Sequence, residues 1–345
     1  MIIEGKARIL VDGIFYNPRM KFCRDLDMLV FSTIGKHEIL DAFSATGVRG
    51  IRAILEADCN VVFNDANPRA VKVIEKNLEL NGILAEVLCK DASLLARERK
   101  FEHIDIDPFG SPANFIESSC VHTSFLSVTA TDLEALCCKA SAGMRKYSAF
   151  VLKTDVPHEI GLRVLIGFIA RTAARFEKAI YPMISWCREH YYRVHVKMRR
   201  SSSETTKTLE KIGFILFCPK CLRKKILKFG EAIEKCKCGE KSKILGPLWL
   251  GELKDIEFVS AMLSKAEGKL KDFLEKIINE IDYPLAYSLP RICSTIRSSV
   301  PPTLDFVEKL RKTGHLASIV HHCSYCVRTD AEIEEIEKIL KERLW

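Results

Sequence analysis

The sequence predicts an α/β protein with a Rossmann-like seven-stranded sheet, followed by a small cysteine-bearing insert and a C-terminal α+β domain. Three observations lead to this prediction. Between residues 38 and 176, short apolar segments alternate with helical segments of about 10–15 residues, as in a parallel sheet covered on both faces. Residues 213–246 are short, basic and cysteine-bearing, and helical periodicity returns after them. We therefore expect three parts, at residues 1–211, 212–245 and 246–345.

The elements of the sheet are expected in order along the first 200 residues. A strand-like lead-in at 7–11 precedes a helix at 19–31. The strands that follow are expected at 38–43, 60–64, 85–89, 101–107 and 125–130, with closing strands at 178–186 and 191–198. The helices between them are expected at 47–57, 68–81, 93–99, 114–123 and 159–176. These strands together give the seven-stranded sheet.

The C-terminal part is expected to be mainly helical. Helical spacing occurs at 256–264, 270–281, 285–296, 304–312 and 331–344, and a strand is expected at 315–322. Two short helices followed by a strand and a turn resemble a winged-helix unit.

Composition and charge limit the possible functions. A hydrophobic share of 48% and a charged share of 28% over 345 residues are ordinary for a soluble globular protein. No apolar run is long enough to cross a bilayer, and the N-terminus has no signal-peptide core, so we expect a cytoplasmic protein without a membrane partner. Residues 188–228 carry twelve Lys or Arg against three Glu, a net +9 that accounts for the whole excess of +8. Such a segment suits nucleic acid, although a solvated face is the simpler explanation.

A strand-ending motif stands near the middle of the predicted sheet. Ile104 and Ile106 have the spacing of a buried strand, which stops at Asp107-Pro108-Phe109-Gly110 because Pro108 cannot donate to a sheet ladder. In an open α/β sheet, ligands bind at the carboxyl ends of the strands. The motif is a variant of an acid–Pro–Pro–aromatic sequence, and it resembles the catalytic loop of methyltransferases that modify an exocyclic amine of a base. Asp-Pro pairs are also common turn formers, so a plain turn is the alternative.

Three further predicted strands also end in an Asp. The loop at 41–50 has small residues that let the backbone approach a ligand, but it is not Gly-x-Gly-x-x-Gly, so a dinucleotide site is poorly supported. S-adenosylmethionine has no pyrophosphate, and its methyltransferases accept looser loops. Asp65 ends the second strand, where a carboxylate can accept both ribose hydroxyls, and Asp91 with the Ala92 amide could read the edge of adenine. An Asp at the end of one strand is easily explained as the cap of the helix that follows, but helix capping explains four such residues less well.

Longer motifs together resemble the tRNA (guanine-26 N2)-dimethyltransferase family in its archaeal form. They match in order over nearly the whole chain and comprise Phe15-Tyr16-Asn17-Pro18-Arg19-Met20 with Arg24-Asp25, the loop and helix start at 41–52, Asp107-Pro108-Phe109-Gly110-Ser111-Pro112, Val128-Thr129-Ala130-Thr131-Asp132 and Gly246-Pro247-Leu248-Trp249-Leu250-Gly251. The family's histidine-phenylalanine-serine near the C-terminus is His322-Cys323-Ser324 here. This departure leaves open how the C-terminal domain meets RNA.

The resemblance implies an enzyme that transfers methyl groups from S-adenosylmethionine to the N2 amine of guanine 26 in tRNA, twice, to give N2,N2-dimethylguanosine. It implies that the cofactor is bound by Arg24, Arg49, Asp65, Asp91 and Ala92. The base would be handled by Asp107, Pro108 and Phe109. The partner would be tRNA, contacted by residues 246–345, and we expect a monomer.

Two close cysteine pairs predict a structural zinc site. Fourteen residues separate the first pair from the second, which is the spacing of a zinc ribbon, and the ligands would be Cys218, Cys221, Cys236 and Cys238. The second pair has one intervening residue where zinc knuckles usually have two, so unliganded thiols or a disulfide are the alternatives. Cys323 and Cys326 could also pair, but they lie at an apolar strand exit and we do not expect it.

Two other functions are open from the sequence. One is an amino-methyltransferase that acts on another RNA or DNA base or on a small molecule, and only the family resemblance disfavours it. The other is a non-catalytic RNA-binding protein whose sheet has lost its cofactor. That protein would have lost Asp65, Asp91 or Asp107, and all three are present. Methyl transfer to bulk tRNA rather than duplex DNA would distinguish the possibilities.

Overall fold

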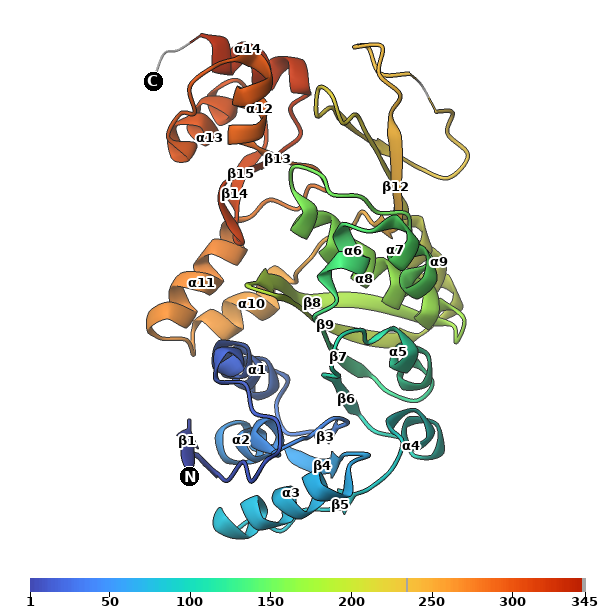
Figure 1. Cartoon of the computed structure of the whole chain (residues 1–345), viewed down its shortest axis with the longest axis vertical. Coiled ribbons are helices and arrows are strands. Elements are labelled where there is room, and N and C mark those ends of the chain that lie inside the picture. Colours follow the sequence, from blue (N-terminus) through green and yellow to red (C-terminus); the bar gives the residue numbers. More distant parts are fainter. Residues whose placement is uncertain (234, 343–345) are drawn as a thin grey trace.

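The computed structural model describes residues 1–233 and 235–342, with the large sheet at one end of the molecule and the C-terminal helices at the other (Figure 1). Within these residues the large sheet has seven strands in the order β5-β4-β3-β6-β7-β9-β8, which confirms the predicted sheet. The strands are β3 (Glu38–Asp41), β4 (Asn60–Asn64), β5 (Val87–Leu88), β6 (His103–Ile106), β7 (Phe125–Ala130), β8 (Lys178–Arg188) and β9 (Tyr191–Arg200). Neighbouring strands from β5 to β7 are parallel, whereas β9 is antiparallel to both β7 and β8.

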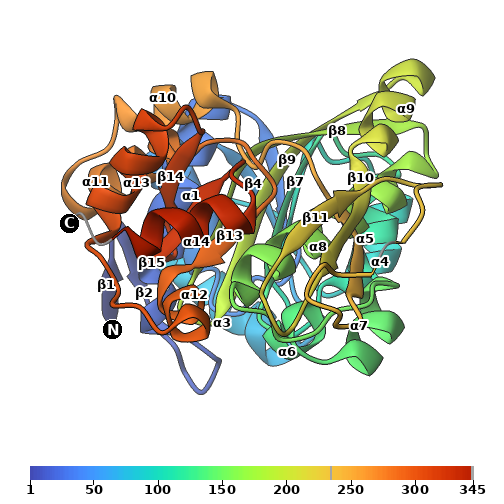
Figure 2. The same cartoon turned by 90° about the horizontal axis from the view of Figure 1, so that it is seen from above.

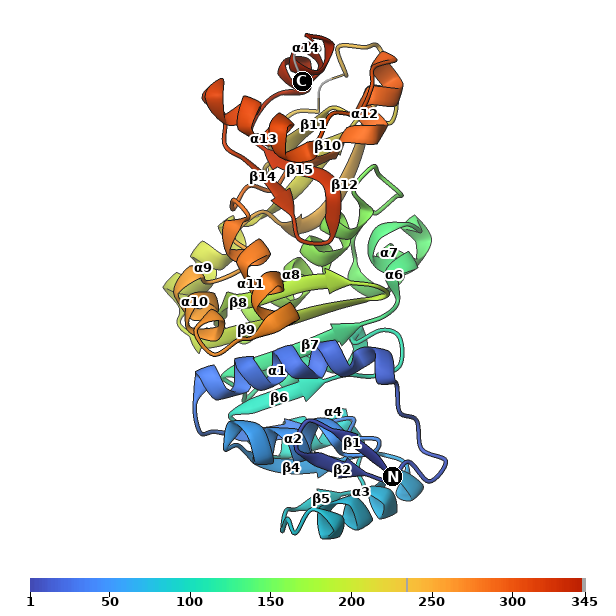
Figure 3. The same ribbon diagram turned by 90° about the vertical axis from the view of Figure 1, so that its left-hand side faces the viewer.

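Helices cover both faces of the sheet and bury most of its strand residues. One face carries α1 (Lys21–Ile34), α2 (Val48–Ala57) and α3 (Pro68–Leu80), and the other carries α4 (Ala92–Glu98), α5 (Ala113–Cys120) and α8 (Pro157–Ala174). Adjacent strand residues such as Ile39 and Leu40 belong to the two separate hydrophobic cores. Figure 3 shows α1 lying along the sheet. No helix in the described ranges is long and apolar enough to span a membrane.

Short elements account for most differences from the predicted order. A hairpin of β1 (Ile2–Glu4) and β2 (Ala7–Ile9) stands where one strand was predicted, and α6 (Leu133–Cys137) and α7 (Ala140–Tyr147) were not predicted. Segments of three to eight residues carry too few periods to reveal their type, so contacts elsewhere in the chain decide it.

The cysteine-bearing insert is a three-stranded antiparallel sheet. Its strands are β10 (Ile212–Phe217), β11 (Lys224–Leu227) and β12 (Lys243–Trp249), in the order β11-β10-β12. Because β12 pairs with β10 from Lys243 to Trp249, this strand crosses the predicted limit between residues 245 and 246. Figure 2 shows this sheet beside the C-terminal helices. We call residues 212–249 the ribbon.

The rest of the chain packs in two places. The helices α10 (Ile256–Leu263) and α11 (Gly268–Asn279) share a hydrophobic core with α1. Beyond them lies an α+β unit of β13 (Ala286–Ser288), α12 (Leu289–Ile296), α13 (Thr303–Lys312), β14 (Ala317–Val320), β15 (Cys323–Thr329) and α14 (Ile333–Lys341), with the strand order β13-β15-β14. One strand, two helices and two more strands give the predicted winged-helix-like arrangement.

Two details of this unit correct the sequence prediction. The first turn of the predicted helix at 285–296 is the strand β13, because Ala286–Ser288 pair with β15, a strand that was not predicted. Cys323 and Cys326 are joined by a disulfide, contrary to the prediction. The last residues of the predicted helix at 331–344 lie outside the described range.

A buried ion-pair cluster joins this unit to the large sheet. Glu159 of α8 accepts from Arg163 Nε at 2.6 Å and from Arg328 Nη2 of β15 at 2.6 Å. The Glu159 side chain is 1% exposed and the two arginines are fully buried. Although burial raises the pKa of Glu159, the two guanidinium charges lower it to about 2. The carboxylate therefore stays ionised between its two partners at neutral pH.

Candidate active site

A cleft of about 410 Å³ opens at the carboxyl ends of β3, β4, β6 and β7, next to the loop before α1. Its volume is that of a small-molecule site. Of the predicted cofactor and catalytic residues, it is lined by Arg24, Arg49, Asp65, Asp107, Pro108 and Phe109. Asp91 and Ala92 are not among its lining residues. A hollow of about 520 Å³ beside the end of α3 is larger, but it holds none of the predicted residues.

The loop after β6 presents its acid and its ring at the mouth of the cleft. Asp107 has a side chain 27% exposed, and Phe109 is 79% exposed. The Phe109 ring meets the ring of Phe15 edge-on, with centroids 4.7 Å apart and an interplanar angle of 76°. Gly110 adopts a φ of +82° and donates its N–H to Thr131 Oγ1 at 3.1 Å. The end of β7 therefore holds this loop in place.

Arg49 binds the loop after β6 through its guanidinium group. It stands in the first turn of α2, and this helix packs so closely on β4 that a Cβ on Gly50 would lie 2.3 Å from a ring carbon of Phe63. Arg49 donates to Asp107 through Nη2 and to Asp105 through Nη1, the latter at 2.7 Å. Its side chain is 8% exposed. Burial lowers the pKa of Arg49, but the surrounding carboxylates raise it well above its usual value, so the guanidinium stays charged.

Arg24 is held by the N-terminal hairpin. Its Nε and Nη2 donate to the two carboxylate oxygens of Glu4 at 2.7 and 2.6 Å, and Tyr16 Oη donates to Glu4 at 2.8 Å. Arg24 Nη2 also donates to the Asn17 carbonyl at 3.0 Å. Burial raises the pKa of Glu4, but hydrogen bonds and the charge of Arg24 lower it to about 2. Glu4 was not recognised from the sequence, because an acid in a three-residue strand has no distinguishing pattern.

Asp65 ties two of the cleft's loops together. Its carboxylate accepts from the Ala45 amide and from the Asn67 amide, both at 2.9 Å. Each oxygen keeps a further lone pair for a ligand. By contrast, Asp91 is exposed and caps α4 by accepting from the amides of Ser93 and Leu94. Its predicted role in binding the cofactor stays a prediction.

Asp41 lines the cleft, although the sequence alone assigns it no role of its own. It ends β3 and is 4% exposed. Its Oδ2 is buried without a hydrogen-bond partner among the described residues. Burial, followed by the nearby Asp105 carboxylate, raises the pKa of Asp41 to about 7. A buried, unpartnered carboxylate oxygen beside a cleft suits a cationic group of a ligand.

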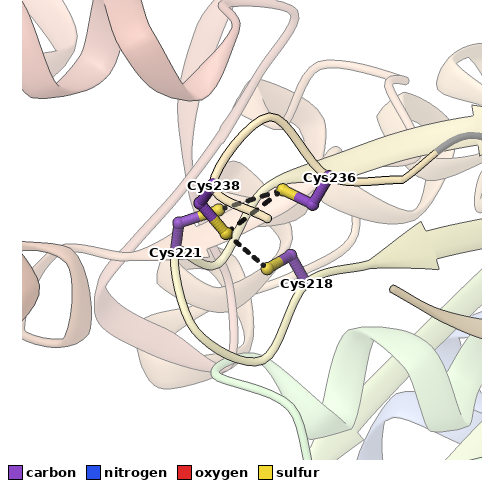
Figure 4. A group of neighbouring side chains, drawn as sticks. All are labelled: Cys218, Cys221, Cys236 and Cys238. Carbon is purple, nitrogen blue, oxygen red and sulfur yellow. Dashed lines mark hydrogen bonds between the residues drawn. The ribbon is translucent and has the colours of Figure 1, made fainter. Parts of the chain in front are cut away.

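The four predicted metal ligands converge in the ribbon. The sulfur atoms of Cys218, Cys221, Cys236 and Cys238 all lie within 4.8 Å of one another (Figure 4). The separation from Cys218 to Cys238 is 3.5 Å, and that from Cys221 to Cys236 is 3.4 Å. A tetrahedron of thiolates about 2.3 Å from zinc has edges of about 3.8 Å, which is close to these values.

The thiol chemistry of this cluster is uneven. Burial raises the pKa of Cys221 to about 12, whereas the pKa of Cys236 falls to about 7, because hydrogen bonds from the Cys238 amide and from neighbouring thiols outweigh its burial. One readily formed thiolate among four close sulfurs is a suitable start for binding a soft divalent cation.

The basic residues at 188–228 do not form one surface facing the cleft. Arg193 and Lys224 are buried, where they pair with Asp105 and Asp155. Lys197 lies opposite Phe125, at the start of β7 and thus at the far edge of the sheet from the cleft. Other basic residues of the segment, such as Lys220 and Lys228, are exposed on the ribbon. The charge count along 188–228 therefore overstates the basic surface, and the contact of this segment with RNA stays a prediction.

Comparisons with known proteins agree with this geometry. The family model described as N2,N2-dimethylguanosine tRNA methyltransferase matches residues 3–341. A tRNA (guanine(26)-N(2))-dimethyltransferase of Archaeoglobus fulgidus is 56% identical over 342 residues, which are 99% of this chain and 98% of that protein. The corresponding protein of Methanospirillum hungatei JF-1 is 37% identical over 94% of this chain and 90% of its own length.

A solved structure covers the same residues. Trm1 from Pyrococcus horikoshii, in complex with S-adenosyl-L-methionine, superposes with a TM-score of 0.91 at 32% sequence identity, covering 98% of this chain and 99% of that one. Fold and sequence therefore agree over nearly the full length. The chain belongs to the N2,N2-dimethylguanosine tRNA methyltransferase family.

Proposed function

We propose that this protein transfers methyl groups from S-adenosylmethionine to the N2 amine of guanine 26 in tRNA and that it does so twice, giving N2,N2-dimethylguanosine. The observation that carries the proposal is one cleft in which the Asp107-Pro108-Phe109 loop lies beside a set of acids and arginines suited to this cofactor. Membership of the family supports the same activity.

The residues of the cleft fit S-adenosylmethionine. Asp65 would accept hydrogen bonds from the ribose hydroxyls, and the unpartnered oxygen of Asp41 would accept one from the methionine ammonium group. Arg24 and Arg49 would lie near the methionine carboxylate, and Asp91 with the Ala92 amide would contact the adenine. When bound, this group supplies a methyl on a positively charged sulfur. The protein's part is to hold the accepting amine in line with that methyl, because positioning carries much of such an acceleration.

Asp107 and Pro108 would orient the guanine amine. The N2 lone pair is delocalised into the ring, so the amine is a weak nucleophile until its hydrogens are directed. In the first transfer the Asp107 carboxylate would accept one N–H and the Pro108 carbonyl the other, which favours a pyramidal nitrogen. In the second transfer Asp107 would accept the single N–H that remains. As the N–C bond would form, the bond from the methyl carbon to the sulfur would break, leaving a neutral thioether, and the nitrogen would lose one proton to Asp107. The proton then reaches solvent at the cleft mouth, since the Asp107 side chain is 27% exposed.

Phe109 and Phe15 would hold the base by stacking. Their rings already meet at the mouth of the cleft and are largely exposed there. Exposed aromatic faces at a site mouth suit a base that has left its helical stack, as enzymes that modify bases require. Stacking on an aromatic side chain is worth ~1–3 kcal/mol per base.

The ribbon would be a second contact for the tRNA backbone, beside the contact predicted for residues 246–345. Residues 212–245 carry nine Lys or Arg against three Glu, and Lys220, Lys228 and Lys237 are exposed. Residues 246–345 carry fourteen Lys or Arg against sixteen Asp or Glu, so their charge alone does not favour RNA. Neutralising phosphates with lysines releases counterions and gives affinity that falls as salt rises.

The cysteine cluster would hold one structural zinc ion. Four thiolates without an open position suit a site that stabilises the fold rather than one that acts on substrate. The cluster lies in the ribbon, whose strands are four to seven residues long, so a bound metal would fix the turns that connect those strands.

Nucleoside analysis tests the proposed function. An unmodified tRNA transcript with guanine at position 26 is incubated with the protein and S-adenosylmethionine, digested, and analysed by mass spectrometry. We expect N2-methylguanosine early and N2,N2-dimethylguanosine later, with neither from a transcript that has adenosine at position 26. Methylation of duplex DNA, or of a base other than guanine, would contradict the proposal, as would cofactor binding without methyl transfer to any RNA.

A further inference from the structure

A buried carboxylate lies behind the catalytic loop, on the inner face of α1. Asp27 has no exposed surface. Its Oδ1 accepts from Arg193 Nε at 2.9 Å, and its Oδ2 lies 3.2 Å from Arg49 Nε. Burial raises the pKa of Asp27, but the charges of Arg193 and Arg49 outweigh it and hold the pKa below its usual range. Asp27 is therefore a buried anion that pairs with two guanidinium groups.

The same two guanidinium groups are shared with Asp105. Arg49 Nη1 donates to Asp105 Oδ1 at 2.7 Å, and Arg193 Nη2 donates to Asp105 Oδ2 at 2.5 Å. Acids and guanidiniums thus alternate around a closed buried ring. The third nitrogen of the Arg49 guanidinium, Nη2, donates to Asp107. The direction of the Asp107 carboxylate therefore depends on where this ring holds Arg49.

A row of buried polar side chains contacts the ring at Asp27. His195 Nε2 lies 3.2 Å from Asp27 Oδ1, and His195 Nδ1 is 2.6 Å from Ser127 Oγ. Ser127 is in turn 2.6 Å from His103 Nε2, and His103 Nδ1 is 2.9 Å from His37 Nε2. Three of these residues come from the neighbouring strands β9, β7 and β6, and His37 directly precedes β3. The ring is thus fixed to the sheet itself, not to a mobile loop.

We propose that Asp27 is a positioning residue for methyl transfer, because it holds Arg49 at the place from which Arg49 orients the Asp107 carboxylate toward the amine. The inference rests on the proposed function. Without the charge on Asp27, Arg49 keeps Asp105 and Asp107 as its anionic partners and draws Asp107 inward. The carboxylate then meets the amine less well, while the surfaces that bind cofactor and tRNA are unchanged.

Asp27→Asn and Glu159→Gln make a matched pair for the test. Each removes the charge of a buried carboxylate between two arginines, but Glu159 lies at the junction of α8 and β15 and has no contact with the ring. The kcat for methyl transfer is measured at steady state with saturating S-adenosylmethionine and tRNA and is expressed per cofactor-binding site. The temperature is kept well below the melting temperatures of both variants. The Kd values of both ligands are measured in parallel.

We expect Asp27→Asn to lower kcat about 10- to 100-fold, the loss typical of small misplacement of a reacting group, with both Kd values within about threefold of the wild type. Glu159→Gln should lower the melting temperature with kcat within about threefold. Equal kcat losses in the two variants, or a wild-type kcat in Asp27→Asn, would overturn the proposal. If the wild type itself fails to methylate tRNA, the proposed function has failed instead.

A milder variant covers the case in which Asp27→Asn does not fold. Thr129 Oγ1 accepts from Arg193 Nη1 at 3.0 Å, and Thr129→Val removes this acceptor without removing a charge. Because the ring then holds Arg193 less firmly, we expect a smaller loss of kcat, about 3- to 10-fold, again without a change in either Kd. An unchanged kcat in a folded Thr129→Val protein would contradict the positioning role.

Discussion

Cofactor affinity should depend on pH through Asp41, the buried carboxyl group with an unpartnered oxygen. Its pKa rises from an ordinary 3.8 to about 7, which disfavours the ionised side chain by about 4 kcal/mol at 1.36 kcal/mol per pKa unit. Because the pKa in the folded state is raised, the native protein retains a proton that the unfolded chain loses. Fold stability from this group therefore decreases as the pH rises from about 4 to about 7, and the loss is complete above that range.

A bound ammonium group reverses this preference, because it favours the ionised carboxylate. Below pH 7, cofactor binding must therefore displace the proton from Asp41. We expect the Kd for S-adenosylmethionine to rise toward tenfold per pH unit as the pH falls from 7 to 5.5. Calorimetry at pH 6, in buffers of different ionisation enthalpy, should detect release of about one proton per cofactor bound.

Two variants separate this effect from a general loss of affinity. Asp41→Asn should bind more weakly at pH 8 but show no proton release and a flat pH response. Asp65→Asn should also bind more weakly, because it removes a ribose partner, yet it should keep the proton release. A flat response in the wild type, or unchanged proton release in Asp41→Asn, would refute the assignment of Asp41 to the ammonium group.

Four further predictions concern the base, the metal and the RNA. Asp107→Ala should abolish methyl transfer while cofactor and tRNA binding persist. Near-native turnover in this variant would show that Asp107 only shapes the turn. Phe15→Leu should raise the KM for tRNA, since a stacked base is worth ~1–3 kcal/mol, and an unchanged KM would contradict its contact with the base. Metal analysis of chelator-free protein should give about one zinc per chain, and its removal should lower the melting temperature; absence of zinc would refute the site. Lys220→Ala with Lys228→Ala should flatten the salt dependence of tRNA binding more than Lys197→Ala does, and equal effects would count against the ribbon.

The sequence predicts the sheet well because the sheet is made from local patterns. Strands buried on both faces are continuous apolar segments, and the helices between them repeat over several turns. The zinc ligands are found for a similar reason, since two short cysteine spacings place the sulfurs whatever the rest of the fold does. In contrast, β1 and β13 are three residues long, which is too short to show a period, and β13 exists because β15 pairs with it from a later part of the chain.

Long-range ion pairs explain why part of the site was missed. Asp27 and Arg193 are 166 positions apart in sequence, and neither has a neighbour in the chain that suggests the pair. Counting charge along 188–228 treats Arg193 as surface charge, whereas the fold buries it against two carboxylates. A local count of charge therefore overstates the basic surface wherever the fold supplies partners from elsewhere.

The four strand-end aspartates show where sequence reasoning stops. In the sequence Asp41, Asp65, Asp91 and Asp107 all stand near the ends of predicted strands. The fold gives Asp107 a charged guanidinium, Asp65 two backbone amides and Asp91 the start of a helix, and it leaves one oxygen of Asp41 without a partner. Because a carboxyl group's chemistry follows from its partners and its burial, four alike residues can take four different tasks. The strand ends predict where the site lies, and the partners decide what each acid does there.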